Sequence, residues 1–241
     1  MIDPFLHRLR QATPHARVTG TLIALNLLVW LANLADGLNP VLPDARELLA
    51  WGGNLLPLTQ REPWRLVSAM FLHAGIIHLA FNMWALWNVG SISERFYGNT
   101  QFALIYLLSG LFGSLASLFF AARTAVSVGA SGAIFGITGA LLAAILLKRD
   151  KLPGPLVASM RSSLFMFVGY SLFLGFTSGV VDNAAHVGGL VSGFLLAWIM
   201  AEKFDWAEYR RHAVSRALLA VGAALAAAFT LWQLLPARPA L

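Results

Sequence analysis

Five polar side chains in an otherwise largely apolar chain have the chemistry of an acyl-transfer site. They are His73, His78, Asn82, Ser131 and His186. A histidine base can remove the proton of a serine hydroxyl during attack on a carbonyl carbon and return it to the leaving amine. Amide and backbone N–H groups beside the pair can stabilise the oxyanion that forms. These residue types therefore predict hydrolysis of an amide bond by a serine nucleophile.

The spacing of the candidate residues supports this prediction. His78 and Asn82 are four residues apart, so their side chains lie on the same face of a helix. Ser131 opens an apolar stretch in the string GASGAIFG, at a helix start where free N–H groups favour negative charge. Gly129 and Gly132 beside it allow a tight turn and the close approach of another segment. We expect the oxyanion donors to be the backbone N–H of Ser131, the Asn82 amide and, as a further candidate, His78.

Two expected helices carry small residues at helical spacing, which lets helix backbones pack closely. The small positions are Gly189 and Gly193 on the face of His186, and Gly132, Gly136 and Ala140 in the helix that Ser131 opens. Packing of these two faces would bring Ser131 and His186 within hydrogen-bonding range. The spacing thus predicts a serine–histidine pair formed between two helices.

Each candidate residue also has a purely structural interpretation. Serine is a favoured N-cap residue, so Ser131 alone could simply cap a helix. His73, His78 and Asn82 could form hydrogen bonds between helices, and His186 could be a buried histidine with a structural partner. A catalytic site is favoured over these structural roles because all five residues lie at a similar depth, near the outer ends of three expected helices. A helix bundle needs none of them for packing.

Other catalytic arrangements fit the sequence less well. Asp182 lies four residues before His186 at an expected helix start, so capping by Asp182 or Asn183 is favoured over a Ser–His–Asp triad. His73 and His78 are five residues apart with no glutamate between them, so the HExxH zinc motif is missing. The chain has no cysteine, which excludes a cysteine nucleophile and thiolate metal ligands. We therefore expect no metal and no cofactor.

The composition indicates that these residues are held inside a membrane. Of the 241 residues, 58% are hydrophobic and only 12% are charged, and the mean hydropathy is +0.70. A soluble domain is about a quarter charged. The alternating segments of a β-barrel are missing, so we expect an all-α, polytopic membrane protein. Its seven predicted spans are residues 18–37, 75–93, 100–121, 131–147, 157–176, 184–201 and 217–235.

The formal charge of +6 reflects membrane topology rather than nucleic-acid binding. The basic residues cluster at the ends of apolar stretches, and no nucleic-acid motif is present. With a cytoplasmic N-terminus, 12 of the 17 Lys and Arg residues lie inside and 5 lie outside. The outer five are Arg46, Arg61, Arg65, Arg123 and Arg238. We therefore expect the N-terminus inside and, with seven spans, the C-terminus outside.

Three segments flank or interrupt the spans. Residues 1–17 are expected to form a polar cytoplasmic leader. The first span after it has no convincing signal-peptidase cleavage site, so we expect it to be retained in the mature protein. Residues 39–65 are too polar to span and are expected to form an amphipathic, partly helical loop in the outer headgroup region. Residues 203–216 are expected to form a short cytoplasmic surface helix. The core then covers residues 18–201, and the C-terminal part covers 202–241.

The ordered set of motifs resembles the rhomboid family of intramembrane serine proteases over residues 18–201. GASG is similar to the family's GxSG motif, HLAFN to its HxxxN motif and AAHVGGLVSG to its AHxxG motif. The resemblance implies that Ser131 is the nucleophile and His186 the general base. It also implies that His78 and Asn82 belong to the oxyanion hole.

Further residues are expected to support this site. They are His73, Gly129, Gly132, Gly189, the Trp64–Arg65 dipeptide of the first loop, Glu94 as a structural anchor with Arg95 nearby, and Phe135. Phe135 stands where some rhomboids have a tyrosine stacked on the catalytic histidine, so it keeps the ring and lacks the hydroxyl. The seventh span resembles the six-plus-one arrangement of part of the family, and its C-terminal position argues against the mitochondrial type.

The resemblance implies a six-helix core that cleaves transmembrane segments of other membrane proteins near the outer face, without a cofactor. The substrate would enter sideways near the second and fifth spans and unwind, because an intact helix hides its peptide bonds. The expected partners are therefore membrane-protein helices and the lipid bilayer, not nucleic acid. Without an organellar leader, the expected location is the bacterial inner membrane. The alternatives are a non-catalytic rhomboid-like protein that binds transmembrane helices and, with less support, a small transporter.

Overall fold

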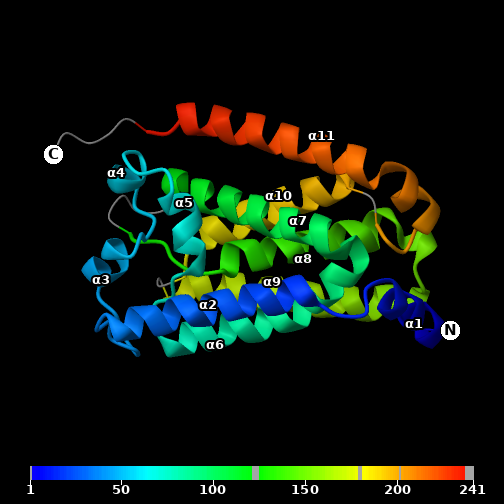
Figure 1. Ribbon diagram of the computed structural model, residues 1–241, viewed down its shortest axis with the longest axis horizontal. Helices are drawn as coiled ribbons and strands as arrows, with labels where there is room; N and C mark the ends of the chain where they lie inside the picture. The colour runs from blue at the N-terminus through cyan, green and yellow to red at the C-terminus, as the bar shows by residue number, and fades with distance from the viewer. Residues whose placement is uncertain (1, 121–124, 179–180, 201, 237–241) are drawn as a thin grey trace.

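The apolar stretches of the sequence form long helices that run alongside one another in a bundle (Figure 1). The computed structural model describes residues 2–120, 125–178, 181–200 and 202–236. The longer helices are α1 (Ile2–Ala12), α2 (Arg17–Ala35), α6 (Ile76–Ala85), α7 (Ser91–Phe120), α8 (Ser131–Leu147), α9 (Gly154–Ser178), α10 (Asn183–Ile199) and α11 (Trp206–Gln233). The shorter ones are α3 (Ala45–Ala50), α4 (Leu56–Thr59), α5 (Arg65–Ser68), the 3₁₀-helices η1 (Ala69–Phe71) and η3 (Arg149–Lys151), and the π-helix η2 (Leu86–Gly90).

The described residues contain a helix for each of the seven spans that the sequence predicted. Helices α2, α9 and α11 are each long and apolar enough to span a bilayer. The continuous stretch of α6, η2 and α7 supplies two crossings, because the chain turns back at Gly98, where φ is 73° (Figure 1). Helices α8 and α10 have 17 residues each, which is at the lower limit of a spanning helix. The chain is thus an all-α, multi-pass integral membrane protein.

Helix α8 occupies the centre of the bundle, between α7, α10 and α9 (Figure 1). Every residue from 132 to 145 in this helix is buried. A helix that is apolar on all sides belongs in a protein interior, which explains why α8 needs no lipid-facing side. Ser131 is the first residue of this helix, so the most buried element of the fold holds the candidate nucleophile.

The loop between the first two spans is partly helical, as predicted. It contains α3, α4 and α5, and Asp44 caps α3 by accepting a hydrogen bond from the backbone N–H of Glu47 at 2.8 Å. Glu47 in turn accepts a hydrogen bond from the backbone N–H of Asp44, which completes a capping box. These local signals explain why a segment too polar to cross the membrane still forms short helices.

The expected separate surface helix over residues 203–216 is wrong. Those residues instead contain the start of α11, which continues without a break into the seventh span. Asp205 caps the helix, and an ion pair joins Glu208 to Arg216 two turns later. Since no proline interrupts residues 206–233, nothing in the sequence stops the helix at the predicted boundary.

The leader contains a helix, α1, that was not among the predicted elements. Phe5 and Leu9 of α1 are buried, and the Phe5 ring lies 6.4 Å from that of Phe204 between centroids. Lys203 donates hydrogen bonds to the carbonyl oxygen of Ala12 and to the hydroxyl of Thr13, at 2.8 and 3.1 Å. The leader therefore packs on the connection between α10 and α11.

Some predicted boundaries lie outside the described residues. These are the ends of the third and sixth spans at residues 121 and 201, and the two outer arginines Arg123 and Arg238.

Candidate active site

Helices α8 and α10 touch through their backbones at the small residues that the spacing had singled out. A methyl group at Gly189 would collide with the carbonyl oxygen of Gly132, and one at Gly193 would collide with that of Gly136. Only glycine fits such a contact. The two predicted faces therefore meet, and the start of α8 with Ser131 lies against the N-terminal part of α10, which carries His186.

His186 is held in place by the helix that carries the serine. Its imidazole stacks on the ring of Phe135, with centroids 4.0 Å apart and planes 10° apart. Only 5% of the surface of His186 is exposed, and within the described residues its Nδ1 atom has no hydrogen-bond partner. Asp182 accepts a hydrogen bond from the backbone N–H of Ala185 at 2.9 Å, so the prediction that it caps the sixth span is confirmed.

Ser131 is half-buried at the N-terminus of α8. Among the residues that the structure describes, no hydrogen bond joins its hydroxyl to the imidazole of His186, whose Nδ1 atom is unpartnered. Catalytic hydrogen bonds are often long until the substrate binds. The predicted hydrogen bond between these two side chains therefore stays a prediction, whereas the helix contact that would bring them together is present.

His78 lies against Gly129, two residues before Ser131. A methyl group at Gly129 would lie 2.7 Å from Cε1 of His78, 2.9 Å from its Nε2 and 3.8 Å from Oγ of Ser131. Gly129 has φ of 126°, a conformation that favours glycine, and its N–H donates to the carbonyl oxygen of Ala69 at 2.9 Å. The turn before Ser131 thus needs glycine for both its backbone and its contact with the histidine.

The proton of His78 can be assigned from its hydrogen bond. Nδ1 accepts a hydrogen bond from the backbone N–H of Ala74 at 3.2 Å. In the neutral imidazole the proton then sits on Nε2, the atom that lies beside Gly129. His78 can therefore donate towards Ser131. His73 packs behind it, fully buried, with the two ring centroids 5.1 Å apart.

Asn82 lies one turn further along α6 from His78. Its Nδ2 donates to the carbonyl oxygen of His78 at 2.9 Å, and only 5% of its surface is exposed. An amide nitrogen has two protons, so this bond uses one of them and leaves a second donor. His78 and Asn82 therefore offer two N–H donors from one face of one helix, as their spacing predicted.

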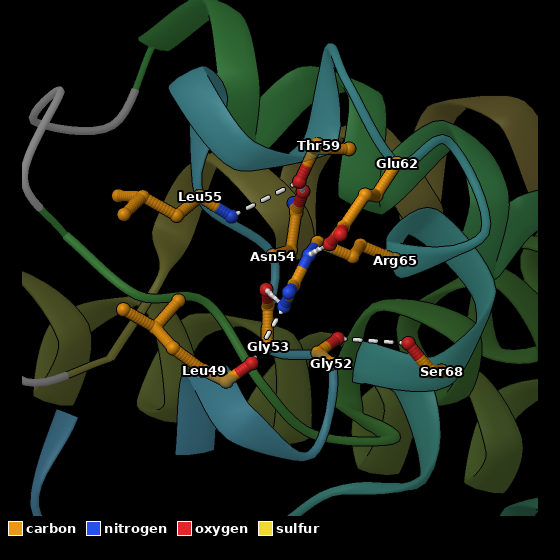
Figure 2. A network of polar contacts seen from close by, with 9 residues as sticks. All are labelled: Leu49, Gly52, Gly53, Asn54, Leu55, Thr59, Glu62, Arg65 and Ser68. Carbon is orange, nitrogen blue, oxygen red and sulfur yellow. Dashed lines mark hydrogen bonds and ion pairs between the residues drawn. The ribbon is translucent and has the colours of Figure 1, made fainter. Parts of the chain in front are cut away.

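Trp64 and Arg65 build the first loop rather than the reaction centre. The Arg65 guanidinium forms an ion pair with Glu62 at 2.6 Å and donates to the carbonyl oxygens of Leu49 and Gly53 at 2.7 and 3.2 Å (Figure 2). It also lies over the Trp64 ring, 4.8 Å from its centroid. Arg65 thus ties α3, the turn after it and α5 together.

Asn54 links this loop to the segment that leads to Ser131. Its backbone exchanges hydrogen bonds of 3.0 and 2.9 Å with that of Ser127. Its side chain accepts a hydrogen bond from the hydroxyl of Thr59 at 2.8 Å (Figure 2) and donates one to the carbonyl oxygen of Ser114 at 2.9 Å. Asn54 was not among the predicted site residues, because two of its partners, Ser114 and Ser127, are 60 or more residues away and no local pattern marks such a pairing.

Glu94 lies far from these residues, near the start of α7. Its fully buried carboxylate accepts hydrogen bonds from the backbone N–H of Val18, the backbone N–H of Thr19 and the Thr19 hydroxyl, at 2.9, 2.8 and 2.7 Å. The carboxylate therefore fixes the start of α2 against the start of α7. Thr19 was not singled out in the sequence, since a lone threonine at a helix start carries no signal.

Together the fold and the site define a polytopic helical membrane protein in which a serine, two histidines and an asparagine from three helices gather near one end of the bundle. The model of the Rhomboid domain family matches residues 60–203. The chain belongs to the rhomboid family.

Several relatives are similar over most of the chain. Rhomboid protease GluP of Bacillus subtilis (strain 168) is 40% identical over 176 residues, which cover 73% of this chain and 33% of the relative. RHOMBOID-like protein 7 of Arabidopsis thaliana is 41% identical over 178 residues, covering 70% and 55% of the two chains. Rhomboid-like protease 1 of Toxoplasma gondii is 29% identical over 228 residues, covering 88% and 75%. The alignments thus span about a third of the Bacillus relative and about half of the Arabidopsis relative.

Proposed function

We propose that the protein is an intramembrane serine endopeptidase that cleaves the transmembrane segments of other membrane proteins. The observation that carries the proposal is the glycine contact between α8 and α10, beside which His186 stacks on the helix that begins with Ser131. Packing alone does not require a histidine and a serine at that contact. Family membership supports the same activity, because a relative at 40% identity is a rhomboid protease.

In the proposed reaction, Oγ of Ser131 attacks the carbonyl carbon of the scissile peptide bond while His186 takes the hydroxyl proton. His186 then gives this proton to the leaving amine, and a water molecule, activated by the same imidazole, hydrolyses the acyl-enzyme. The oxyanion receives hydrogen bonds from the backbone N–H of Ser131, from Asn82 and from Nε2 of His78. Loss of one such donor lowers rates by about a hundredfold to a thousandfold in serine hydrolases.

The proposed substrate is a single helix that enters the bundle from the lipid and unwinds near Ser131. We propose that the N-terminus is cytoplasmic and that the site faces the outer half of a bacterial inner membrane, because most Lys and Arg residues then lie inside. Helix-breaking residues in the substrate should favour cleavage, since they expose peptide bonds that an intact helix hides. The activity needs no cofactor.

The test compares purified wild type and Ser131→Ala with a labelled single-span substrate in detergent. Cleavage by the wild type alone supports the proposal. Cleavage by both proteins would point to a contaminant or to another nucleophile. If neither protein cleaves any of several substrates while the folded protein still binds them, the protein is a non-catalytic rhomboid-like helix binder.

A further inference from the structure

A second polar region lies at the end of the bundle away from Ser131. It is a cavity of about 470 Å³ lined by Pro14, His15 and Ala16 of the α1–α2 connection, Trp87 of η2, and Ser91 and Arg95 of α7. Ser91 lies 13 residues beyond His78 on one continuous helical stretch, which corresponds to about 20 Å. None of these six residues belongs to the proposed active site.

The cation in this cavity lacks a counter-ion. Nη1 of Arg95 donates to the carbonyl oxygen of Ser91 at 2.8 Å, which holds the guanidinium in place. Within the described part of the chain Arg95 forms no ion pair, and its buried Nε has no hydrogen-bond partner. The buried hydroxyl of Ser91 also has none. A buried donor without an acceptor lowers the stability of the fold. None of the residues that line the cavity is a carboxylate, so the acceptor for Arg95 and Ser91 has to come from a ligand.

The chemistry of these groups matches a phosphate. A guanidinium binds phosphate oxygens through two parallel N–H donors, and here a serine hydroxyl and the exposed His15 add further donors. Within the described residues only one of the five N–H donors of Arg95 is used, by the carbonyl oxygen of Ser91. Arg17, exposed at the start of α2, follows Ala16 of the cavity lining and adds a second positive charge to this segment.

An exposed aromatic row leads away from the cavity along the lipid-facing side of the second span. Phe81, Trp84 and Trp87 follow one another at steps of three and are 68%, 63% and 57% exposed. Residues three apart share a helix face, so the row is continuous with Trp87 at the cavity. Exposed tryptophan beside basic residues marks the level of lipid headgroups. A ligand with both a phosphate and an acyl chain matches both features, whereas free phosphate matches only the first.

We propose that this cavity binds the phosphate of an anionic membrane phospholipid, with Arg95 as its main ligand and an acyl chain along Phe81, Trp84 and Trp87. The bound lipid joins the α1–α2 connection to the end of the helix that begins with the proposed oxyanion residues. The proposal does not depend on the chemistry of Ser131, so it holds for a protease and for a non-catalytic helix binder.

The test uses the full-length chain, purified in detergent and stripped of lipid, with short-chain phosphatidylglycerol as the probe and native mass spectrometry as the readout. We expect a retained lipid adduct in the wild type and an apparent affinity about tenfold lower in Arg95→Gln, because a charge-assisted hydrogen bond is lost. Arg211→Gln, which removes an exposed arginine of α11, is the matched control and should bind as the wild type does. Equal binding by Arg95→Gln and wild type would overturn the proposal.

Two further arms complete the test. Inorganic phosphate as a competitor should leave the adduct intact at concentrations equal to that of the lipid. If it displaces the lipid there, the site binds phosphate alone and the lipid assignment is wrong. If Arg95→Gln does not fold, as judged by thermal unfolding, Ser91→Ala replaces it and should also weaken the adduct. An unchanged adduct in Ser91→Ala and in His15→Ala would overturn the proposal in that case.

Discussion

The ring of Phe135 and the imidazole of His186 are stacked, with centroids 4.0 Å apart and planes 10° apart. Phe135 is one helical turn after Ser131, so a single helix both begins with the proposed nucleophile and orients the proposed base. The backbone contact between Gly132 and Gly189 fixes the distance between the two helices. Within the described residues, the relative positions of the serine and the histidine are thus set by helix packing and by the ring stack.

Replacement of Phe135 by leucine should lower kcat with little change in KM. The stacking partner of His186 is lost, and an aromatic pair is worth roughly 1 kcal/mol, which corresponds to about fivefold in rate. Cleavage kinetics on the single-span substrate measure this effect. Phe135→Tyr keeps the ring and should remain close to the wild type. A leucine variant as active as the wild type would show that the stack does not orient the base.

Replacement of Gly193 by alanine should destabilise the fold. The added methyl group would collide with the carbonyl oxygen of Gly136, and overpacking of this kind costs about 1–3 kcal/mol. The matched control is Gly222→Ala in α11, where a methyl group meets no atom within 4 Å and should stabilise the helix by about 0.5–1 kcal/mol. Unfolding by heat or by SDS in detergent compares the two. Equal stability of both variants would contradict the close helix contact.

Replacement of Glu94 by glutamine should lower the free energy of unfolding by about 2–3 kcal/mol. The carboxylate accepts three hydrogen bonds from Val18 and Thr19, and an amide of the same shape cannot accept all of them as a charged group does. Glu208→Gln is the control, because its ion pair with Arg216 is partly exposed and such pairs are worth at most about 1 kcal/mol. The SDS concentration at half-unfolding gives both values, and similar losses would argue against an anchoring role for Glu94.

The fold could be predicted, and the candidate site residues could be singled out, because their signals are local. The lengths of the apolar stretches indicated the spans, and the residues around Ser131 and His186 form short contiguous motifs. Asn54 and Thr19 could not be predicted, since each acts through a partner 60 or more residues away in the chain. The continuity of α11 from Trp206 to Gln233 was not predicted, for another reason. Polar residues mark where a helix leaves the membrane, but they do not mark where the helix ends.

Replacement of Arg65 by lysine should lower activity although the charge is kept. A lysine cannot reach Glu62 and the carbonyl oxygens of Leu49 and Gly53 at once, because it lacks the planar fork of arginine. The loop would loosen, and through the pairing of Asn54 with Ser127 it would misplace the turn before Ser131. We expect about a tenfold fall in kcat/KM, since roughly 1.4 kcal/mol corresponds to a factor of ten.

The control for this prediction lies in the same loop. Arg46→Lys changes an exposed arginine of α3 in the same way and should leave kcat/KM unchanged. Limited proteolysis adds a second measurement, because a loosened loop should be cut faster in Arg65→Lys than in the control. Equal proteolysis and equal activity would show that Arg65 does not order the loop.

Helix α9 has the smallest buried share among the four long candidate spans, which makes it the candidate for lateral substrate access. Many of its large side chains are exposed, among them Phe165, Tyr170, Phe173 and Phe176. Nδ2 of Asn183 at the start of α10 donates to the carbonyl oxygen of Leu172 at 3.1 Å. This bond holds the end of α9 that lies nearest to His186.

Replacement of Asn183 by alanine should therefore raise the cleavage rate, because it removes a hydrogen bond that keeps α9 against α10. A net bond energy of roughly 0.6 kcal/mol would give about a threefold increase if opening of α9 limits the rate. Thr177→Ala, which removes a hydroxyl that among the described residues donates only to carbonyl oxygens of α9 itself, is the control and should change nothing. Tryptophan substitutions along α6 and along α9 provide the opposite test, since bulk there should change the cleavage rate. Unchanged rates in Asn183→Ala and throughout the tryptophan series would place substrate access elsewhere in the bundle.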